Sequence, residues 1–411
     1  MKTERLLAGV RIAIVSHSAR SGGAEQVMLE TIEILQHCGA DCRVVLPESG
    51  SICEELRRLG VPFAIIRFPH WVTRAPRSPW LRAKTAVGSA VAALRLAWQL
   101  RRWRSDVVYT NTVTLCVGAL AARLLRLPHL WHLHEFGYDD HGFRFIFGER
   151  LSLAAINMLS KRCICVSKAL VERYRLFVDE PKITAVYPSL HRGQRNRGDD
   201  CAAERESFCS HSQRYRCAIV GTLIEGKGQE DAVRAFAELK DRVGDAELLI
   251  IGEGLPGYRS YLQSLIQSLG IDHRVVFTGH IANPTQLMRS CDLILICSRR
   301  EGLGRVTIEA MLAGKPVIGS NTGATAEIIH DGVTGLLYEH GNCADLASKI
   351  RLLHDNPGFA RQLAQNGRIW AETHFSAERN AAEMCQVIAP LVIHHHSSGG
   401  GAIEYPPVAV G

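Results

Sequence analysis

The chain contains 411 residues, of which 46% are hydrophobic and 22% are charged, and its formal net charge is +7. This composition is typical of a globular protein and excludes an intrinsically disordered chain. Because a single hydrophobic core stops growing at roughly 250–300 residues, we expect two domains.

The sequence predicts neither a targeting segment nor a membrane span. The N-terminus lacks an uninterrupted apolar region with a cleavage site, and no stretch reaches the roughly 18 consecutive apolar residues of a spanning helix. The thirteen cysteines are scattered without a C-x-x-C pair, which argues against a zinc or thiol–disulfide centre. We therefore expect a cytoplasmic protein, peripheral to the inner face of the membrane if it meets one.

Residues 1–190 alternate short β-branched runs with helix-length segments, as in a parallel sheet with crossover helices. The strands are predicted at residues 11–16, 41–46, 63–67, 107–110, 129–133, 163–167 and 183–187. Gly22 and Gly23 follow the first strand at a turn into a helix, where glycine lets the backbone approach a diphosphate. An ordinary flexible loop is the alternative for this turn.

A basic helix is predicted within residues 77–104, in a region (residues 56–105) with eleven Lys or Arg and no acidic residue. Its apolar residues include Leu81, Val87, Val91, Leu94 and Trp98. Its basic residues include Arg95, Arg101, Arg102 and Arg104. Such a helix, with tryptophans near its ends, fits an anionic membrane surface. A helix that packs on the core with a solvated basic face is an equal alternative, and nucleic acid fits less well because no recognised binding motif is present.

His132 and His134 are predicted to lie on the same side of a strand. An H-x-H pair can bind metal, but no matching ligand cluster and no D-x-D motif is evident, so we predict no metal site. His134 stands at the carboxyl end of the strand, before a glycine turn, and is predicted to face a ligand crevice. A hydrogen-bonded structural histidine is the alternative.

Residues 191–215 are polar and strandless, and we predict that they link the two domains. The second domain, residues 216–375, has predicted strands at residues 217–220, 247–251, 274–278, 293–297, 316–319 and 335–338. A closing helix is expected at residues 376–392, followed by a flexible tail at residues 393–411. The predicted fold class is α/β, with two Rossmann-like domains in tandem.

Two glycine-rich turns of the second domain match known fingerprints imperfectly. The turn from Gly252 to Gly257 fits G-x-G-x-x-G, but Pro256 interrupts it and no acidic residue follows to hold a ribose, which argues against a dehydrogenase. The turn from Gly221 resembles a P-loop, but Gly228 stands where Ser or Thr would hold magnesium, which argues against an NTPase. Lys227 in this turn is still a cation that could bind a phosphate group.

Residues 298–327 place Glu301 and Glu309 eight residues apart, across the turn Gly302-Leu303-Gly304. Glu309 lies in a predicted helix that begins at Arg305, is otherwise largely apolar and ends at Gly314. A carboxylate on such a buried helix needs a partner. That partner is either Arg305, one turn earlier, or a pair of ligand hydroxyls beside a helix N-terminus that attracts phosphate.

In chain order, the runs SGGAE, VYTNT, HLHE, VSKAL, VGTLIEGKGQ, IIGEG, FTGHI and EGLGRVTIEAMLAGKPVIG resemble those of the retaining glycosyltransferases of family 4. The resemblance extends to about residue 392. It implies a GT-B fold, in which two Rossmann-like domains with parallel sheets face a central cleft. It also implies metal-independent transfer of a hexose, with no cofactor, from a nucleotide sugar such as a UDP- or GDP-hexose. The acceptor would be a polysaccharide, glycan or lipid-linked molecule in cell-surface glycan synthesis, such as lipopolysaccharide.

The resemblance also assigns roles to the residues of the second domain. Glu309 would hold the ribose hydroxyls, Glu301 the hydroxyls of the transferred sugar, and Lys227 the charge of the departing diphosphate. The diphosphate would lie at the turn formed by Gly302, Leu303, Gly304 and Arg305. The loop at His280 and Ile281 would contact the base.

From the first domain, Gly22 and Gly23 would approach the diphosphate, and His134 would lie beside the reacting sugar. The sequence departs from the family where Thr222 follows Gly221, a position at which many members carry an arginine. This removes one charge-assisted contact, for which Arg299, Arg300 or a residue of the other domain could substitute. The remaining alternatives are a nucleotide-sugar epimerase or hydrolase, and a catalytically weak nucleotide-sugar-binding protein.

Overall fold

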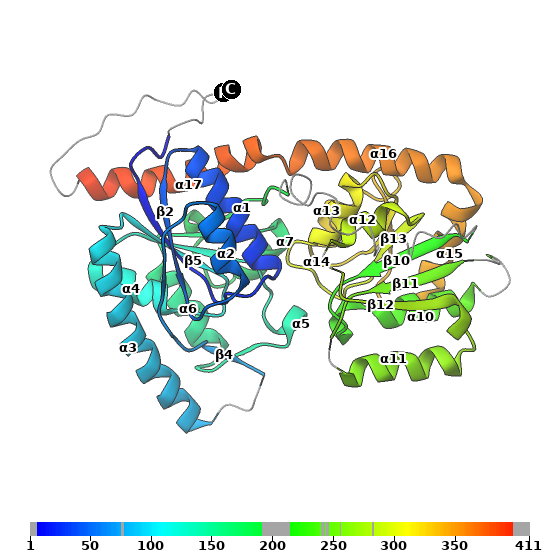
Figure 1. Ribbon diagram of the computed structural model, residues 1–411, viewed down its shortest axis with the longest axis horizontal. Helices are drawn as coiled ribbons and strands as arrows, with labels where there is room; N and C mark the ends of the chain where they lie inside the picture. Colours follow the sequence, from blue (N-terminus) through cyan, green and yellow to red (C-terminus); the bar gives the residue numbers. More distant parts are fainter. Residues whose placement is uncertain are drawn as a thin grey trace. The chain divides into compact units, whose positions relative to one another are not determined.

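The computed structural model describes residues 6–74, 78–190, 214–239, 243, 246–254, 256–281 and 283–397. The chain forms two compact units (Figure 1). The first unit contains Met1–Gly137, Gly142–Ser189 and Ala377–Gly411, and the second contains Tyr138–His141 and Leu190–Ser376.

The first unit is built on a seven-stranded sheet in the order β3-β2-β1-β5-β6-β8-β9, in which all pairs are parallel. Its strands are β1 (Arg11–Val15), β2 (Asp41–Leu46), β3 (Phe63–Ile65), β5 (Val107–Asn111), β6 (His129–Leu133), β8 (Arg162–Cys165) and β9 (Ile183–Ala185). All seven predicted strands are confirmed, each boundary within two residues. The central strands β5 and β6 are buried throughout, because helices cover both faces of the sheet.

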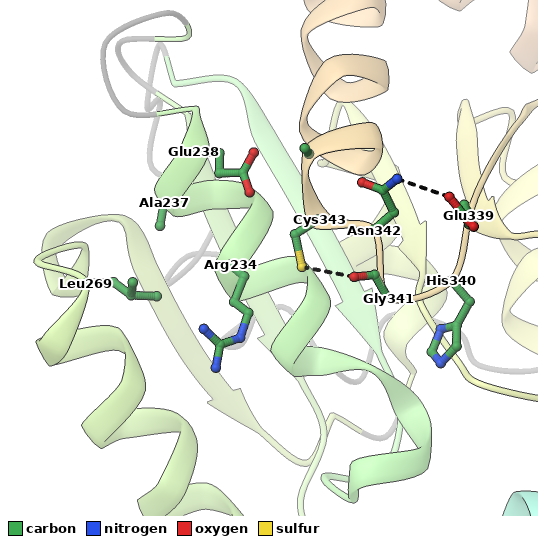
Figure 2. Close-up of a pocket in the computed structure, with 10 residues that line it drawn as sticks. Arg234, Ala237, Glu238, Leu269, Glu339, His340, Gly341, Asn342 and Cys343 are labelled. Atoms are coloured by element: carbon green, nitrogen blue, oxygen red, sulfur yellow. Dashed lines mark hydrogen bonds between the residues drawn. The ribbon is translucent and has the colours of Figure 1, made fainter.

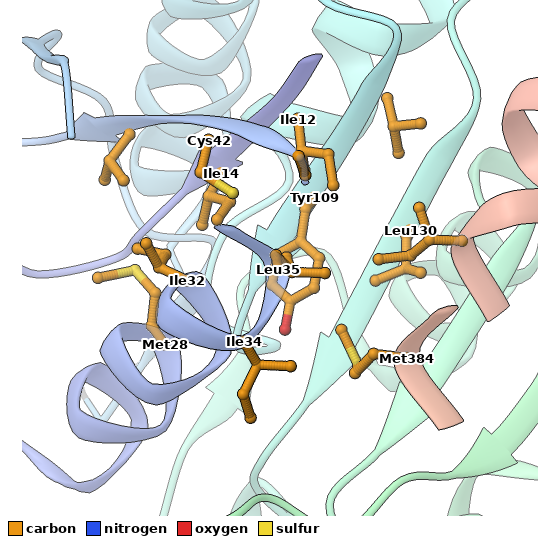
Figure 3. Packing of buried hydrophobic residues seen from close by; sticks show 14 of the residues in the cluster. Ile12, Ile14, Met28, Ile32, Ile34, Leu35, Cys42, Tyr109, Leu130 and Met384 are labelled. Atoms are coloured by element: carbon orange, nitrogen blue, oxygen red, sulfur yellow. The ribbon is translucent and has the colours of Figure 1, made fainter. Parts of the chain in front are cut away.

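The helices of the first unit follow the strands as crossovers. They are α1 (Gly23–His37), α2 (Ser51–Arg58), α3 (Pro79–Trp103), α4 (Val117–Leu125), α6 (Glu149–Leu159), α7 (Lys168–Tyr174) and the short η1 (Glu180–Lys182). The C-terminal helix α17 (Ala377–Ser397) also belongs to this unit. Figure 3 shows Met384 of α17 in the same buried cluster as Leu35 of α1 and Leu130 of β6. Asn380 also donates to the carbonyl of Tyr187 at 2.7 Å.

The sequence analysis did not predict one small antiparallel pair of strands. Strands β4 (Val72–Thr73) and β7 (Arg144–Phe145) form an antiparallel pair. Each is two residues long, so neither can show the alternation of side chains by which a strand is recognised.

The second unit is built on a six-stranded parallel sheet in the order β12-β11-β10-β13-β14-β15. Its strands are β10 (Arg216–Val220), β11 (Glu247–Ile251), β12 (Val275–Gly279), β13 (Leu293–Ile296), β14 (Val317–Ser320) and β15 (Leu336–Tyr338). Its helices are α5 (Tyr138–His141), η2 (Glu225–Lys227), α10 (Gln229–Glu238), α11 (Pro256–Ser268), η3 (Asp272–Arg274), α12 (Pro284–Arg289), α13 (Arg305–Leu312), α14 (Gly323–Ile328), α15 (Cys343–Asp355) and α16 (Pro357–His374). All six predicted strands are confirmed.

The C-terminal prediction needs correction. Residues 393–397 continue α17 and are not part of a tail, and residues 398–411 lie outside the described part of the chain. Most of the predicted linker, residues 191–213, lies outside it as well. Among the helices that the structure describes, none combines the length and hydropathy needed to cross a bilayer.

The described cysteines are all free, and all but Cys343 are buried. This agrees with the expectation that they pack as small hydrophobic residues.

Candidate functional site

The strand order of the second unit places the loops that follow β10 and β13 side by side at one edge of the sheet. From β10 the chain moves to β11 and β12 on one side, whereas β13 pairs with the other side of β10. In an open parallel sheet, ligands bind at the carboxyl ends of the strands where the order reverses in this way. The loops that follow β10 and β13 carry Lys227 and Glu301.

These two loops are held together by a glycine. Gly228 has φ +67°, in the left-handed region, and a Cβ at this position would lie 2.0 Å from the carbonyl oxygen of Cys297. No residue with a side chain fits there without moving the backbone. The amide of Arg299 also donates to the carbonyl of Gly226 at 2.9 Å. The loop after β10 is therefore locked against the end of β13.

Lys227 and Glu301 form an ion pair at this point. The Lys227 Nζ lies 2.7 Å from the Glu301 Oε1, and both side chains are largely buried. Ser298 donates its hydroxyl to the same Oε1 at 2.5 Å. The carbonyl of Ser298 in turn accepts from the hydroxyl of Ser320, at the end of β14, at 2.6 Å. Glu301 is thus oriented by a buried hydroxyl as well as by a cation.

The turn between the two glutamates leads directly into α13. Gly304 has φ +74° and precedes the first helical residue, and its carbonyl accepts from the amide of Thr307 at 2.9 Å. Leu303 is buried. The carbonyl of Glu301 accepts from the amide of Ala324 in α14 at 3.0 Å. The N-terminal end of α13, where the helix dipole favours an anion, therefore lies within a few residues of Glu301.

Glu309 has the helical partner that the sequence offered as one of two alternatives. The Arg305 Nη2 lies 3.4 Å from the Glu309 Oε1. Burial raises the pKa of Glu309 above its usual value, although the positive charge of Arg305 opposes this shift. The contact is long for an ion pair, so Glu309 retains capacity to accept further hydrogen bonds.

The remaining predicted residues of the second unit lie along the same edge of the sheet. The amide of Gly221 donates to Ile251 O at 2.9 Å, and the amide of Gly252 donates to Gly279 O at 2.9 Å. Ile281 follows Gly279 by two residues. Thr222 is exposed, and its carbonyl accepts from the side chain of Gln229 at 3.0 Å.

The first unit has a corresponding arrangement at the point where its strand order reverses, between β1 and β5. The Oδ1 of Asn111, at the end of β5, accepts from His134 Nε2 at 2.9 Å, and the Nδ2 of Asn111 donates to the carbonyl of Ala24 at 3.2 Å. Since Ala24 is in the first turn of α1, Asn111 joins His134 to the helix start at Gly22 and Gly23. The next residue, Thr112, is buried with φ +77°, a strained conformation for a β-branched residue.

The H-x-H pair does share one side of the sheet, with ring centroids 4.2 Å apart. His132 is buried against the hydroxyl of Tyr109, and burial lowers the pKa of His132 to about 3, so its ring is neutral. Within the described ranges, no three His, Cys, Asp or Glu side chains gather as metal ligands would.

Ser298 and Asn111 are the residues that the sequence analysis missed. Both lie at or just after the carboxyl end of a strand, and this position was the one feature of the sequence by which they could have been found. Small polar residues are common at such positions, however, and only the contacts with Glu301 and His134 distinguish these two.

A separate pocket of about 730 Å³ lies between α10 and the start of α15 (Figure 2). Its lining residues are Arg234, Ala237, Glu238, Leu269, Glu339, His340, Gly341, Asn342, Cys343 and Ala344. None of these is a predicted site residue. The pocket is therefore distinct from the Lys227–Glu301 site.

Two family models match the chain, and together they cover most of it. Residues 22–189 match a glycosyl transferase 4-like domain, and residues 202–370 match glycosyl transferases group 1. The second match includes the Lys227–Glu301 site, and the first includes His134 and Asn111.

Curated relatives include 2-deoxystreptamine glucosyltransferase of Streptomyces kanamyceticus, 32% identical over 75% of this chain and 86% of that enzyme. N-acetyl-alpha-D-glucosaminyl L-malate synthase of Bacillus anthracis is also 32% identical, over 52% of this chain; the match spans only 55% of that enzyme. Among solved structures, Anabaena Alr3699/HepE in complex with UDP has a TM-score of 0.76 at 23% identity, covering 93% of this chain and all of that one. The last comparison shows a shared fold.

Proposed function

Because the chain belongs to the group 1 glycosyl transferases and has the GT-B fold, we propose that it transfers a hexose from a nucleotide sugar to a glycan, polysaccharide or lipid-linked acceptor, with retention of anomeric configuration and without a metal. The observation that carries this proposal is the Lys227–Glu301 ion pair at the reversal point of the second sheet. The pair offers a cation for a diphosphate and a carboxylate for sugar hydroxyls, side by side.

In the proposed complex, the diphosphate lies between Lys227 and the start of α13, at the turn from Gly302 to Arg305. Lys227 then exchanges the carboxylate of Glu301 for a phosphate oxygen. Glu301 accepts instead from hydroxyls of the hexose, while Ser298 holds its Oε1 in place. Glu309 accepts from the ribose hydroxyls, and the loop at Ile281, with the neighbouring Gly221–Thr222 turn, contacts the rest of the nucleotide.

The chemical step breaks the bond between the anomeric carbon and the diphosphate oxygen, and the electron pair stays on that oxygen. Lys227 and the helix amides stabilise the developing charge, and each such donor is worth about 3 kcal/mol in comparable sites. The acceptor hydroxyl oxygen attacks on the same face of the sugar. Its proton passes to the departing phosphate, so no side-chain nucleophile is needed.

The first unit contributes the residues proposed to act on the reacting end of the donor. His134 is proposed to lie beside the sugar, and Gly22 and Gly23 to approach the diphosphate. The contact of Asn111 with both His134 and Ala24 supports a common role, because it fixes the histidine relative to the start of α1.

The function is tested by mass spectrometry of a panel of UDP- and GDP-hexoses, incubated with the purified full chain and a glycan and lipid extract. UDP-glucose is the first donor to test, since a structural neighbour was solved with it. We expect one donor to be consumed only when extract is present. Lys227→Ala should lower the rate about 100-fold or more. Lys349→Ala is the control, because it also breaks a lysine–carboxylate pair, with Asp345, but away from the site.

Other outcomes separate the alternative activities. Conversion of the donor to free sugar without extract would identify a hydrolase, and conversion to an isomeric donor would identify an epimerase. Tight donor binding with no turnover against any extract would identify a binding protein. Full activity of the Lys227→Ala variant would contradict the site assignment.

A further inference from the structure

Helix α3 has an exposed apolar surface on one side. Five apolar residues of this helix are between 43% and 68% exposed: Trp80, Val87, Val91, Leu94 and Trp98. Their spacing of seven, four, three and four residues places them in one line along the helix. We call these five residues the α3 stripe.

The stripe is not the side by which α3 packs on its own unit. The buried residues of α3 are Thr85, Ser89, Ala92, Ala93, Leu96, Ala97 and Leu100. Several of them join a core cluster with residues of β1, β5 and α4. The packing side combines Leu96 and Leu100 with small and polar residues, whereas the five residues of the α3 stripe face solvent. As in the core-packing alternative, α3 packs on its own unit, but it does so without Val87, Val91, Leu94 and Trp98, which are exposed.

Positive charge surrounds the stripe. The exposed basic residues of α3 are Arg82, Lys84, Arg95, Arg101 and Arg102, and the helix contains no acidic residue. Two of these cations lie over the stripe's indole rings. The Lys84 Nζ is 4.9 Å from the ring centroid of Trp80, and the Arg102 Cζ is 4.9 Å from that of Trp98.

The surface is fixed in position before any partner binds. The side chain of Ser78 caps the N-terminus by accepting from the amide of Leu81 at 3.1 Å, and Pro79 occupies the first helical position. At the other end, Arg104 adopts a left-handed C-cap with φ 50°. Little ordering of the helix is therefore required on binding.

We propose that α3 docks the protein on an anionic lipid bilayer, with the helix lying in the plane of the interface. The stripe would enter the boundary between headgroups and acyl chains, and the flanking Arg and Lys residues would remain at headgroup level. Tryptophan prefers this same depth. A nucleic acid would satisfy the positive charges but not the aliphatic residues of the stripe. The inference goes beyond the proposed function and does not depend on it.

The test is flotation of the purified full chain with vesicles of phosphatidylcholine alone, or of phosphatidylcholine with phosphatidylglycerol. We expect flotation with the anionic vesicles only, and weaker flotation at high salt. The triple variant Arg95→Gln, Arg101→Gln, Arg102→Gln should lower vesicle affinity by about 100-fold, since each basic residue near an anionic surface contributes several-fold. The control is Arg58→Gln, Arg289→Gln, Arg361→Gln, which changes three exposed arginines outside α3. Both variants have the same net charge of +4 (7 − 3).

The contribution of the stripe is measured with Val91→Ser, Leu94→Ser, which should also lower affinity for anionic vesicles. Leu352→Ser, Ile369→Ser is the matched control, because both residues are exposed apolar side chains of the second unit. Circular dichroism should show that all four variants stay folded, since every changed side chain is exposed. Quenching of tryptophan fluorescence by lipids brominated in the acyl chain should fall in Trp80→Phe, Trp98→Phe.

The proposal is contradicted if the wild-type chain does not float with anionic vesicles. It is also contradicted if the α3 variants float as well as their controls. Binding to nucleic acid but not to vesicles would point to a different class of partner and would equally overturn it. Turnover of a water-soluble acceptor, where one is found, should be unchanged by the α3 substitutions, so failure of this test and failure of the proposed function can be told apart.

Discussion

The ion pair between Lys227 and Glu301 brings together two opposite charges that are both largely buried. Removing one partner from such a pair leaves the other uncompensated. A diphosphate with its attached sugar offers a replacement for both at once, since phosphate accepts from Lys227 and sugar hydroxyls donate to Glu301. The hydroxyl of Ser298 stays on Glu301 throughout this exchange, which makes Ser298 a positioning residue.

Glu309→Gln should separate stability from donor binding. Burial raises the pKa of Glu309, so its ionisation is less favourable in the folded than in the unfolded chain. The stability that this residue contributes is complete below its unfolded pKa and is lost as the pH rises through the folded pKa. The neutral glutamine should therefore raise the melting temperature at pH 7 but not near pH 4. Donor affinity should fall about tenfold, because hydrogen bonds to a neutral amide are weaker.

The two measurements are thermal unfolding against pH and donor titration. A variant that is less stable than the wild-type chain at pH 7 would show that the Arg305–Glu309 pair outweighs the cost of burial. Unchanged donor affinity would remove Glu309 from the site and leave that ion pair as its whole role.

The positions of the strands could be predicted from the sequence, but which side of a helix is buried could not. Each of the thirteen predicted strands is present, because buried parallel strands are nearly continuous hydrophobic runs. In α3, periodicity identified one apolar line that includes Val87 and Leu94, but the helix packs by another line, which contains Leu96, Leu100 and several alanines. The sequence pattern alone does not indicate which of two lines of apolar side chains is buried.

Gly228→Ala tests whether the loop after β10 must touch β13. The added Cβ would lie 2.0 Å from a backbone oxygen, at φ +67°. We expect a loss of about 3 kcal/mol in the free energy of unfolding, from backbone strain and overpacking together, along with a loss of activity as Lys227 shifts. Gly257→Ala is the control. A Cβ there has no neighbour within 4 Å, and alanine in a helix should stabilise the chain by about 0.5–1 kcal/mol. Chemical denaturation measures both, and equal effects would contradict the close approach.

For the whole molecule, most of the site could be predicted from the sequence because its residues cluster in short runs after strands. Lys227 and Glu301 are 74 residues apart, yet each follows a strand, and the order of strands brings them together. Membership of the units could not be predicted in this way. Helix α17 follows the second unit in the chain but packs in the core of the first. Its apolar residues would suit a terminal helix of either unit or a separate closing element, so the sequence does not indicate where it packs.

The most direct test of the Lys227–Glu301 site is calorimetric titration with a nucleoside diphosphate and with its nucleoside, for the wild-type chain and Lys227→Met. If Lys227 holds the diphosphate, the substitution should weaken binding of the diphosphate about 10- to 100-fold, as expected for loss of a charge-assisted hydrogen bond, and leave binding of the nucleoside unchanged. An equal effect on both ligands, or no effect on either, would contradict the account.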